Sequence, residues 1–152
     1  MSLELTINND IKAAMLAKDK MHLSATRAVK AAILLAKTAE GASGEELSDD
    51  EVIKIIQKLV KQRKESADIY TQQNRPELAE VEVEEAKAME IYLPKQLSEA
   101  EIEAELRKII ESVGAKSPAD MGKVMGVATK ALSGKADGRI ISALVKQILA
   151  EN

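Results

Sequence analysis

The sequence contains no cysteine, no phenylalanine and no tryptophan, and it has only two tyrosines and one histidine. The absence of cysteine excludes disulfide bonds, thiolate metal sites and a cysteine nucleophile. The single histidine, His22, has no second histidine or cysteine at ligand spacing, so we expect a surface residue rather than a metal ligand or a general base. No metal site and no cofactor are therefore predicted.

The scarcity of aromatic residues also bears on the fold. The 152 residues are 45% hydrophobic and 31% charged, which is enough apolar content for a buried core. That core must consist of Ala, Leu, Ile, Val and Met, a composition that favours helices over strands. We therefore predict an all-α protein.

Long hydrophobic runs are missing as well. The longest, Ala31 to Ala36, is far shorter than the roughly 20 residues that a membrane-spanning helix needs. The chain does not begin with basic residues followed by an apolar segment, so no secretory leader is predicted. From these two observations we expect a cytoplasmic protein with no membrane among its partners.

The first two helices are predicted from caps and apolar spacing. The first begins at Asn8 or Asn9 and turns Ile11, Met15 and Leu16 inward, while Asp19 caps the second. Ser48 followed three residues later by a glutamate fits a capping box and begins a third, long helix.

The third and fourth helices have opposite charge. Lys61, Arg63 and Lys64 form a secondary basic patch on the third helix. The stretch from Pro76 to Lys95 has six glutamates against two lysines, a net charge of −4. A basic helix followed through a short turn by an acidic one indicates an antiparallel pair, whose charges can also simply neutralise each other.

A domain boundary is predicted at Pro94, because a residue before proline is disfavoured in a helix. Residues 1–94 then form an N-terminal helical domain and residues 95–152 a small C-terminal helical tail domain. Ser98 and Glu101 make a second capping box at the start of the tail.

The tail is predicted to end in a helical hairpin around a tight corner. One helix opens at Ser117-Pro118 and closes at Gly134, and Asp137 caps the next. The apolar faces expected to be buried are Met121, Val124, Met125, Ala128 and Leu132 on the first helix, and Ile140, Ile141, Leu144, Val145, Ile148 and Leu149 on the second.

Glycines interrupt the first helix of this hairpin. Gly122 and Gly126 are four residues apart, and each costs helix stability by about 1 kcal/mol relative to alanine. Together with Gly134 at the corner, they are predicted to allow close approach of another backbone.

The hairpin is also basic. Between Lys116 and Lys146 there are six basic residues against two acidic ones, a local charge of +4 in a chain of net charge −3. The residues expected to bind a nucleic acid are Lys116, Lys123, Lys130, Lys135 and Arg139. A solvated basic face is the alternative.

These motifs resemble those of a known family. Met121-Gly-Lys-Val-Met-Gly126, Gly134-Lys-Ala-Asp-Gly138, Arg75-Pro-Glu-Leu-Ala79 and Tyr92-Leu-Pro-Lys-Gln-Leu-Ser98 are similar to the YqeY family, and the tail resembles the C-terminal domain of the GatB subunit of tRNA-dependent amidotransferase. The resemblance implies an all-helical protein with a larger N-terminal domain and a small tail domain. It also implies an association with carbon–nitrogen ligase activity that uses glutamine as amido-nitrogen donor.

The sequence contains no motif that indicates catalysis. The sequence has no phosphate-binding loop, no serine in a glycine-rich turn and no cluster of acids and histidines, so no catalytic residue is predicted. We expect a non-catalytic protein that binds tRNA or another structured RNA, with an amidotransferase subunit as a possible protein partner. The alternative is a protein-interaction adaptor without a nucleic-acid ligand.

Overall fold

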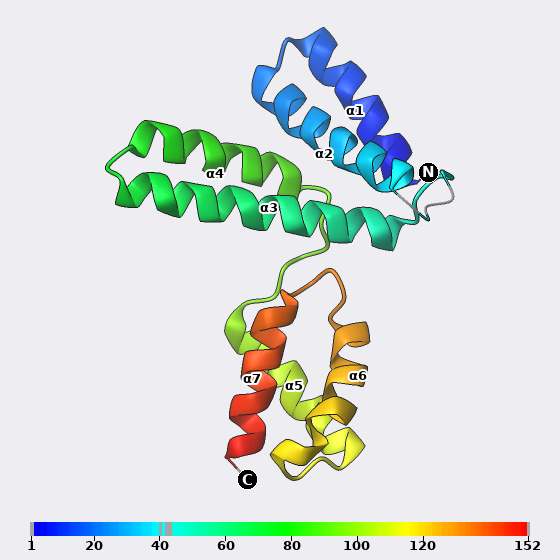
Figure 1. Ribbon diagram of the computed structural model, residues 1–152, viewed down its shortest axis with the longest axis vertical. Helices are drawn as coiled ribbons and strands as arrows, with labels where there is room; N and C mark the ends of the chain where they lie inside the picture. The colour runs from blue at the N-terminus through cyan, green and yellow to red at the C-terminus, as the bar shows by residue number, and fades with distance from the viewer. Residues whose placement is uncertain (1, 40, 42–43, 152) are drawn as a thin grey trace. The chain divides into compact units, whose positions relative to one another are not determined.

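The computed structural model describes residues 2–39, 41 and 44–151. Within those ranges the chain forms seven α-helices and one short 3₁₀ helix, with no strand, which confirms the all-α prediction (Figure 1). The chain divides into two compact units, Met1–Leu93 and Pro94–Asn152.

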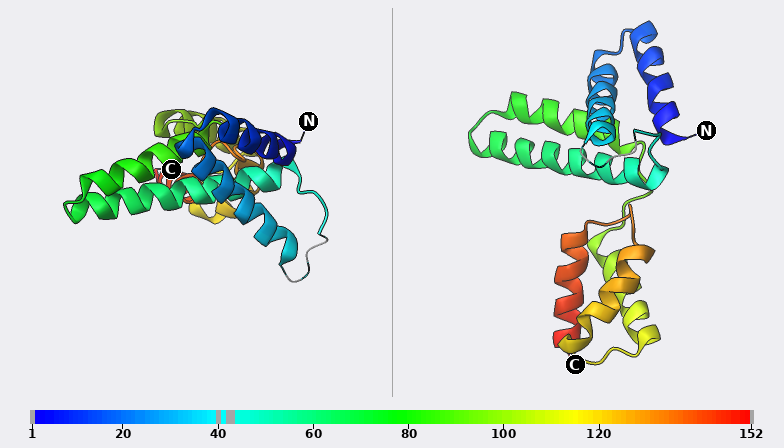
Figure 2. Two further views of the ribbon diagram at one scale, coloured as in Figure 1. Left: turned by 90° about the horizontal axis from the view of Figure 1, so that it is seen from above. Right: turned by 45° about the vertical axis from the view of Figure 1, so that its right-hand side comes forward.

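The first unit consists of two helical hairpins. Its helices are α1 (Leu3–Ala17), α2 (Lys20–Thr38), α3 (Asp49–Gln72) and α4 (Pro76–Glu90). The α1–α2 hairpin crosses the α3–α4 hairpin (Figure 2). α2 contacts both α3 and α4, and α1 contacts α3. The core between the hairpins is aliphatic, and its largest fully buried side chains are Ile7, Ile33, Ile56 and Met89.

The helices of the first unit begin where a side chain can accept a backbone hydrogen bond. Asp19 and Ser48 cap α2 and α3 as predicted, each accepting from the amide three residues on. The predicted start of α1 was wrong. Ser2 accepts from the amide of Leu5, so α1 begins before the asparagines that were expected to cap it.

Burial on α1 also differs from the prediction. Met15 and Leu16 were expected to point inward, yet they are 54% and 86% exposed. The buried face of α1 is formed instead by Ile7 and Ala14. Ile7 and Ala14 are seven residues apart and share one face of the helix, whereas Leu16 lies on the opposite side.

The second unit is a three-helix tail domain. Its elements are α5 (Glu99–Val113), the 3₁₀ helix η1 (Pro118–Asp120), α6 (Met121–Ala131) and α7 (Gly138–Ala150). The Ser98–Glu101 capping box is present in both directions, and Gly114 ends α5 in a left-handed conformation. The core contains Leu106 from α5, Val124 from α6 and Val145 from α7. Ile140, predicted to be buried, is 43% exposed.

The glycines of the tail have two different roles. A Cβ atom added at Gly122 or Gly126 would meet no atom within 4 Å, and both residues are exposed. The predicted close approach of another backbone is therefore absent from the described chain, because α6 packs through the face of Val124 and Ala128. Gly134 is needed for its conformation instead, since its φ of +77° is one that other residues rarely adopt.

The aliphatic core of the first unit can be tested with two isoleucines on the same helix. We expect Ile56→Ala to destabilise the first unit by about 3 kcal/mol, because Ile56 is fully buried and its loss leaves a cavity. Ile69→Ala is the matched control. Its side chain is half exposed, so the loss should stay below about 1 kcal/mol. Urea unfolding followed on amide signals of α3 measures both changes, and equal losses would contradict the assigned core.

The glycines predict changes of opposite sign. Gly126→Ala should stabilise the tail by about 0.5–1 kcal/mol, because alanine favours an exposed helix and the added Cβ meets nothing. Gly134→Ala should destabilise it by about 1–2 kcal/mol, because of the left-handed backbone. Urea unfolding followed on amide signals of α6 and α7 gives both values. A loss of stability in Gly126→Ala would mean that this glycine has a packing role within the chain.

Candidate nucleic-acid interface

The start of α6 is held by the carboxylate of Asp120. Its Oδ2 accepts hydrogen bonds from the backbone amides of Lys116, at 2.9 Å, and Ser117, at 3.3 Å. These bonds, helped by the charge of Lys123, hold the pKa of Asp120 below its usual value. The carboxylate therefore stays ionised near neutral pH and fixes the turn from which α6 begins.

Two lysines lie on the solvent side of α6. Val124, Ala128 and the following Leu132 are buried, and Lys123 and Lys130 lie on the opposite side, where both are exposed. The two lysines are seven residues apart, which separates their Cα atoms by about 10 Å along the helix axis. Packing of the apolar face is thus what directs both charges outward.

The corner between α6 and α7 is tied to the segment that precedes α5. The amide of Leu97 donates to the carbonyl oxygen of Lys135 at 3.0 Å, and the side-chain amide of Gln96 donates to the carbonyl oxygen of Gly134 at 2.7 Å. Asp137 then caps α7 by accepting from the amide of Arg139 at 2.8 Å. The side chains of Lys135 and Arg139 are exposed on either side of this fixed corner.

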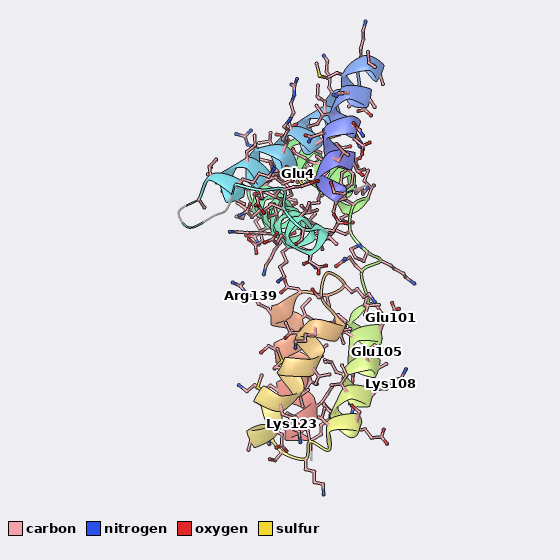
Figure 3. All side chains as sticks on the ribbon, turned by 90° about the vertical axis from the view of Figure 1, so that its right-hand side faces the viewer. Glu4, Glu101, Glu105, Lys108, Lys123 and Arg139 are labelled. Atoms are coloured by element: carbon pink, nitrogen blue, oxygen red, sulfur yellow. The ribbon has the colours of Figure 1, made fainter. Side chains whose placement is uncertain are left out.

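The five predicted binding residues form two groups rather than one. Figure 3 shows Lys123 and Arg139 toward opposite ends of the tail domain. Lys116 precedes η1 and so belongs with Lys123, whereas Lys130 and Lys135 adjoin the corner with Arg139. The five residues therefore do not form a single compact cluster. The arrangement suits an extended polyanion, such as a nucleic-acid backbone, better than a small anion.

These five side chains remain available to a ligand. All five residues are exposed, and none of them is in an ion pair of the described chain. The charges on α5 are different, because Arg107 pairs with Glu103 and Glu151, and Lys108 pairs with Glu105. Lys123, Lys130, Lys135 and Arg139 thus remain unpaired in the described chain, on α6 and around the corner.

The secondary basic patch on α3 is not available in the same way. Arg63 lies 3.2 Å from Glu85 and 3.9 Å from Glu82, and Lys64 lies 2.8 Å from Glu90. Lys61 also has an interaction partner. Arg63 and Lys64 of the predicted second basic patch are thus paired with glutamates of the acidic α4, which lies against α3.

One recess in the first unit was missed by the sequence analysis. It is lined by Asp10, Ala13, Ala14, Ala17, Asp19, His22 and Ile91. The Tyr92 hydroxyl donates to Asp10 Oδ2 at 2.5 Å, and burial together with this bond raises the pKa of the tyrosine above its usual value. The two residues are 82 positions apart, so no local pattern in the sequence could indicate the contact.

The described residues offer no visible centre for catalysis. They contain no group of three or more His, Asp or Glu side chains placed to hold a metal ion. In the recess, Asp19 is used as the cap of α2 and Asp10 as the acceptor for Tyr92.

Three curated proteins similar to this chain share one name, "Altered inheritance of mitochondria protein 41, mitochondrial". The protein of Meyerozyma guilliermondii is 34% identical over 80% of this chain and 64% of its own length. That of Clavispora lusitaniae is 32% identical over 70% and 61%, and that of Lachancea thermotolerans is 30% identical over 74% and 60%. The chain thus spans less than two thirds of the length of these relatives.

The relatives correct the predicted location. All three carry a mitochondrial name, which contradicts the prediction of a cytoplasmic protein. That prediction was drawn only from the sequence of the first residues and from the shortness of the apolar runs. Neither feature indicates the compartment in which a folded domain works.

The family follows from a match along nearly the whole chain. The model of the YqeY family, described as Yqey-like protein, matches residues 4–149, which include all of α2 to α6 and the corner between α6 and α7. This confirms the resemblance that the tail motifs and the Arg75 and Tyr92 segments indicated. The chain belongs to the YqeY family of Yqey-like proteins.

Proposed function

We propose that this protein binds structured RNA, with tRNA as the first candidate, through the basic surface of α6 and the α6–α7 corner. The observation that carries the proposal is a set of five exposed cations, none of them in an ion pair, on one small rigid domain. The resemblance of this tail to the C-terminal domain of the GatB subunit supports the choice of tRNA.

Recognition would proceed through phosphates and shape. The tail contains no aromatic residue on which a base could stack, and stacking is a principal route to sequence-specific recognition of single-stranded RNA. Lysine and arginine side chains spread over both ends of α6 can instead follow a backbone. The role of the protein would then be to hold RNA for chemistry that a partner performs, such as glutamine-dependent amide transfer.

Salt dependence tests this mode of binding. We expect the logarithm of the tRNA affinity to fall against the logarithm of salt concentration with a slope of about −3 to −4, as for about four neutralised phosphates. Lys130→Gln, Lys135→Gln and Arg139→Gln should each reduce that slope by about 1. Fluorescence anisotropy with labelled tRNA measures the affinity at each salt concentration.

Lys108→Gln on α5 provides the matched control. It removes one exposed positive charge from the same domain, but that charge is already paired with Glu105, so the slope should not change. The proposal is abandoned if tRNA does not bind at low salt, or if the three corner variants and the control behave alike.

A protein-interaction adaptor is the second candidate, and one observation favours it. Gly122 and Gly126 leave an uncovered strip on α6 where a helix of another chain could approach closely. Gly126→Leu would block such a helix and leave every cation in place. Loss of a nuclease-resistant protein partner in this variant, with tRNA affinity unchanged, would favour the adaptor.

A further inference from the structure

The outer side of the α1–α2 hairpin exposes large apolar side chains. The residues are Leu5, Met15 and Leu16 on α1, and Leu34 and Leu35 on α2. Leu16 is 86% exposed and Leu35 is 73% exposed, so these side chains project from the surface. Exposed apolar groups gathered on one part of a protein commonly mark a surface that contacts another molecule or a membrane.

Cations lie among these leucines. Leu5, Lys12 and Leu16 are seven and four residues apart and therefore share one face of α1, opposite its buried face. Arg27, Lys30 and Leu34 share one face of α2 in the same way, by spacings of three and four. Lys18 and Lys20 add two more exposed positive charges at the turn between the helices.

The acidic residues of the hairpin do not neutralise this surface. Glu4 pairs with Lys37, Asp10 accepts from Tyr92, and Asp19 caps α2. None of the five cations, Lys12, Lys18, Lys20, Arg27 and Lys30, is in an ion pair of the described chain. The α2 helix contains no acidic residue from Lys20 to Thr38.

We propose that this outer surface of the α1–α2 hairpin binds peripherally to an anionic phospholipid bilayer. The cations would lie among the lipid phosphates, and the projecting leucines would enter the boundary between headgroups and acyl chains. None of the helices in the described ranges is long and apolar enough to cross a membrane, so the contact is with the surface alone.

The combination of charge and shape favours a bilayer over other occupants. A nucleic acid would pair with the cations and leave the leucines in water. A partner helix buries its anchors best in a recess, whereas Leu16 and Leu35 protrude. The recess in this unit lies on another flank of α1, beside Ala13, Ala17 and Ile91. A fluid lipid surface can surround separate projecting side chains without a matching groove.

This inference revises the expectation of no membrane partner. That expectation rested on the short apolar runs and on the sequence of the first residues, and neither bears on contact with a membrane surface. Met15 and Leu16 were separately expected to point inward. The structure exposes both residues. The inference does not depend on RNA binding, because it concerns a different unit of the chain.

Vesicle binding tests it with the full chain. Wild-type protein should sediment with vesicles of equal parts phosphatidylcholine and phosphatidylglycerol, and much less with phosphatidylcholine alone. Leu16→Gln combined with Leu35→Gln should lower the partition coefficient by about tenfold or more. The reason is that the variant loses the favourable free energy of transferring two leucine side chains from water into the bilayer. Arg27→Gln combined with Lys30→Gln should lower it to a similar extent, since each cation near an anionic surface adds attraction.

Ile69→Gln combined with Val81→Gln is the matched control. These two residues are also about half exposed but lie on α3 and α4, so vesicle binding should stay at the wild-type level. The circular dichroism and unfolding midpoint of each variant show that it is folded. Absence of wild-type binding at low salt overturns the proposal, and so does binding that the leucine variant retains. A wild-type dimer that the leucine variant converts to a monomer, without vesicle binding in either, would assign the surface to a second copy of the chain.

Discussion

Packing of small aliphatic side chains between helices is the interaction on which this structure depends. In the tail domain, Leu106, Val124 and Val145 bring one face from each of three helices into a common core. A helix that buries one face must present the other to solvent, so the same packing directs Lys123 and Lys130 outward. The proposed interface is therefore a consequence of how the tail buries its apolar surface, and no additional structural feature is needed to expose these lysines.

Similar basic residues acquire different roles in the two units because their neighbours differ. Arg63 and Lys64 lie on a helix that packs against an acidic one, and glutamates of α4 hold both. Lys130 and Lys135 are exposed, and neither is in an ion pair of the described chain. Because attraction between exposed charges is weak in water, the neutralised patch contributes little to stability, but it is unavailable to a ligand.

The two units thus carry basic surfaces of different character. On the tail, the cations accompany glycines and two partly exposed aliphatic residues, Val127 and Ile140, which are 42% and 43% exposed. On the α1–α2 hairpin, cations alternate with leucines that water surrounds. Charge alone suits a hydrated polyanion, whereas charge with exposed leucine suits an interface that is both anionic and apolar. One chain can in this way hold two separate binding surfaces.

Local chemistry made much of the fold predictable from the amino-acid sequence. Asp19, Ser48, Ser98 and Asp137 each cap a helix as predicted, because a cap needs only a side chain and an amide two or three residues away. Tertiary structure alone decided which charges are neutralised, that Gly126 has nothing packed against it, and that Met15 and Leu16 are exposed. Those outcomes depend on which helices lie against each other and through which faces. Such contacts join residues far apart in the chain, and spacing within one helix does not record them.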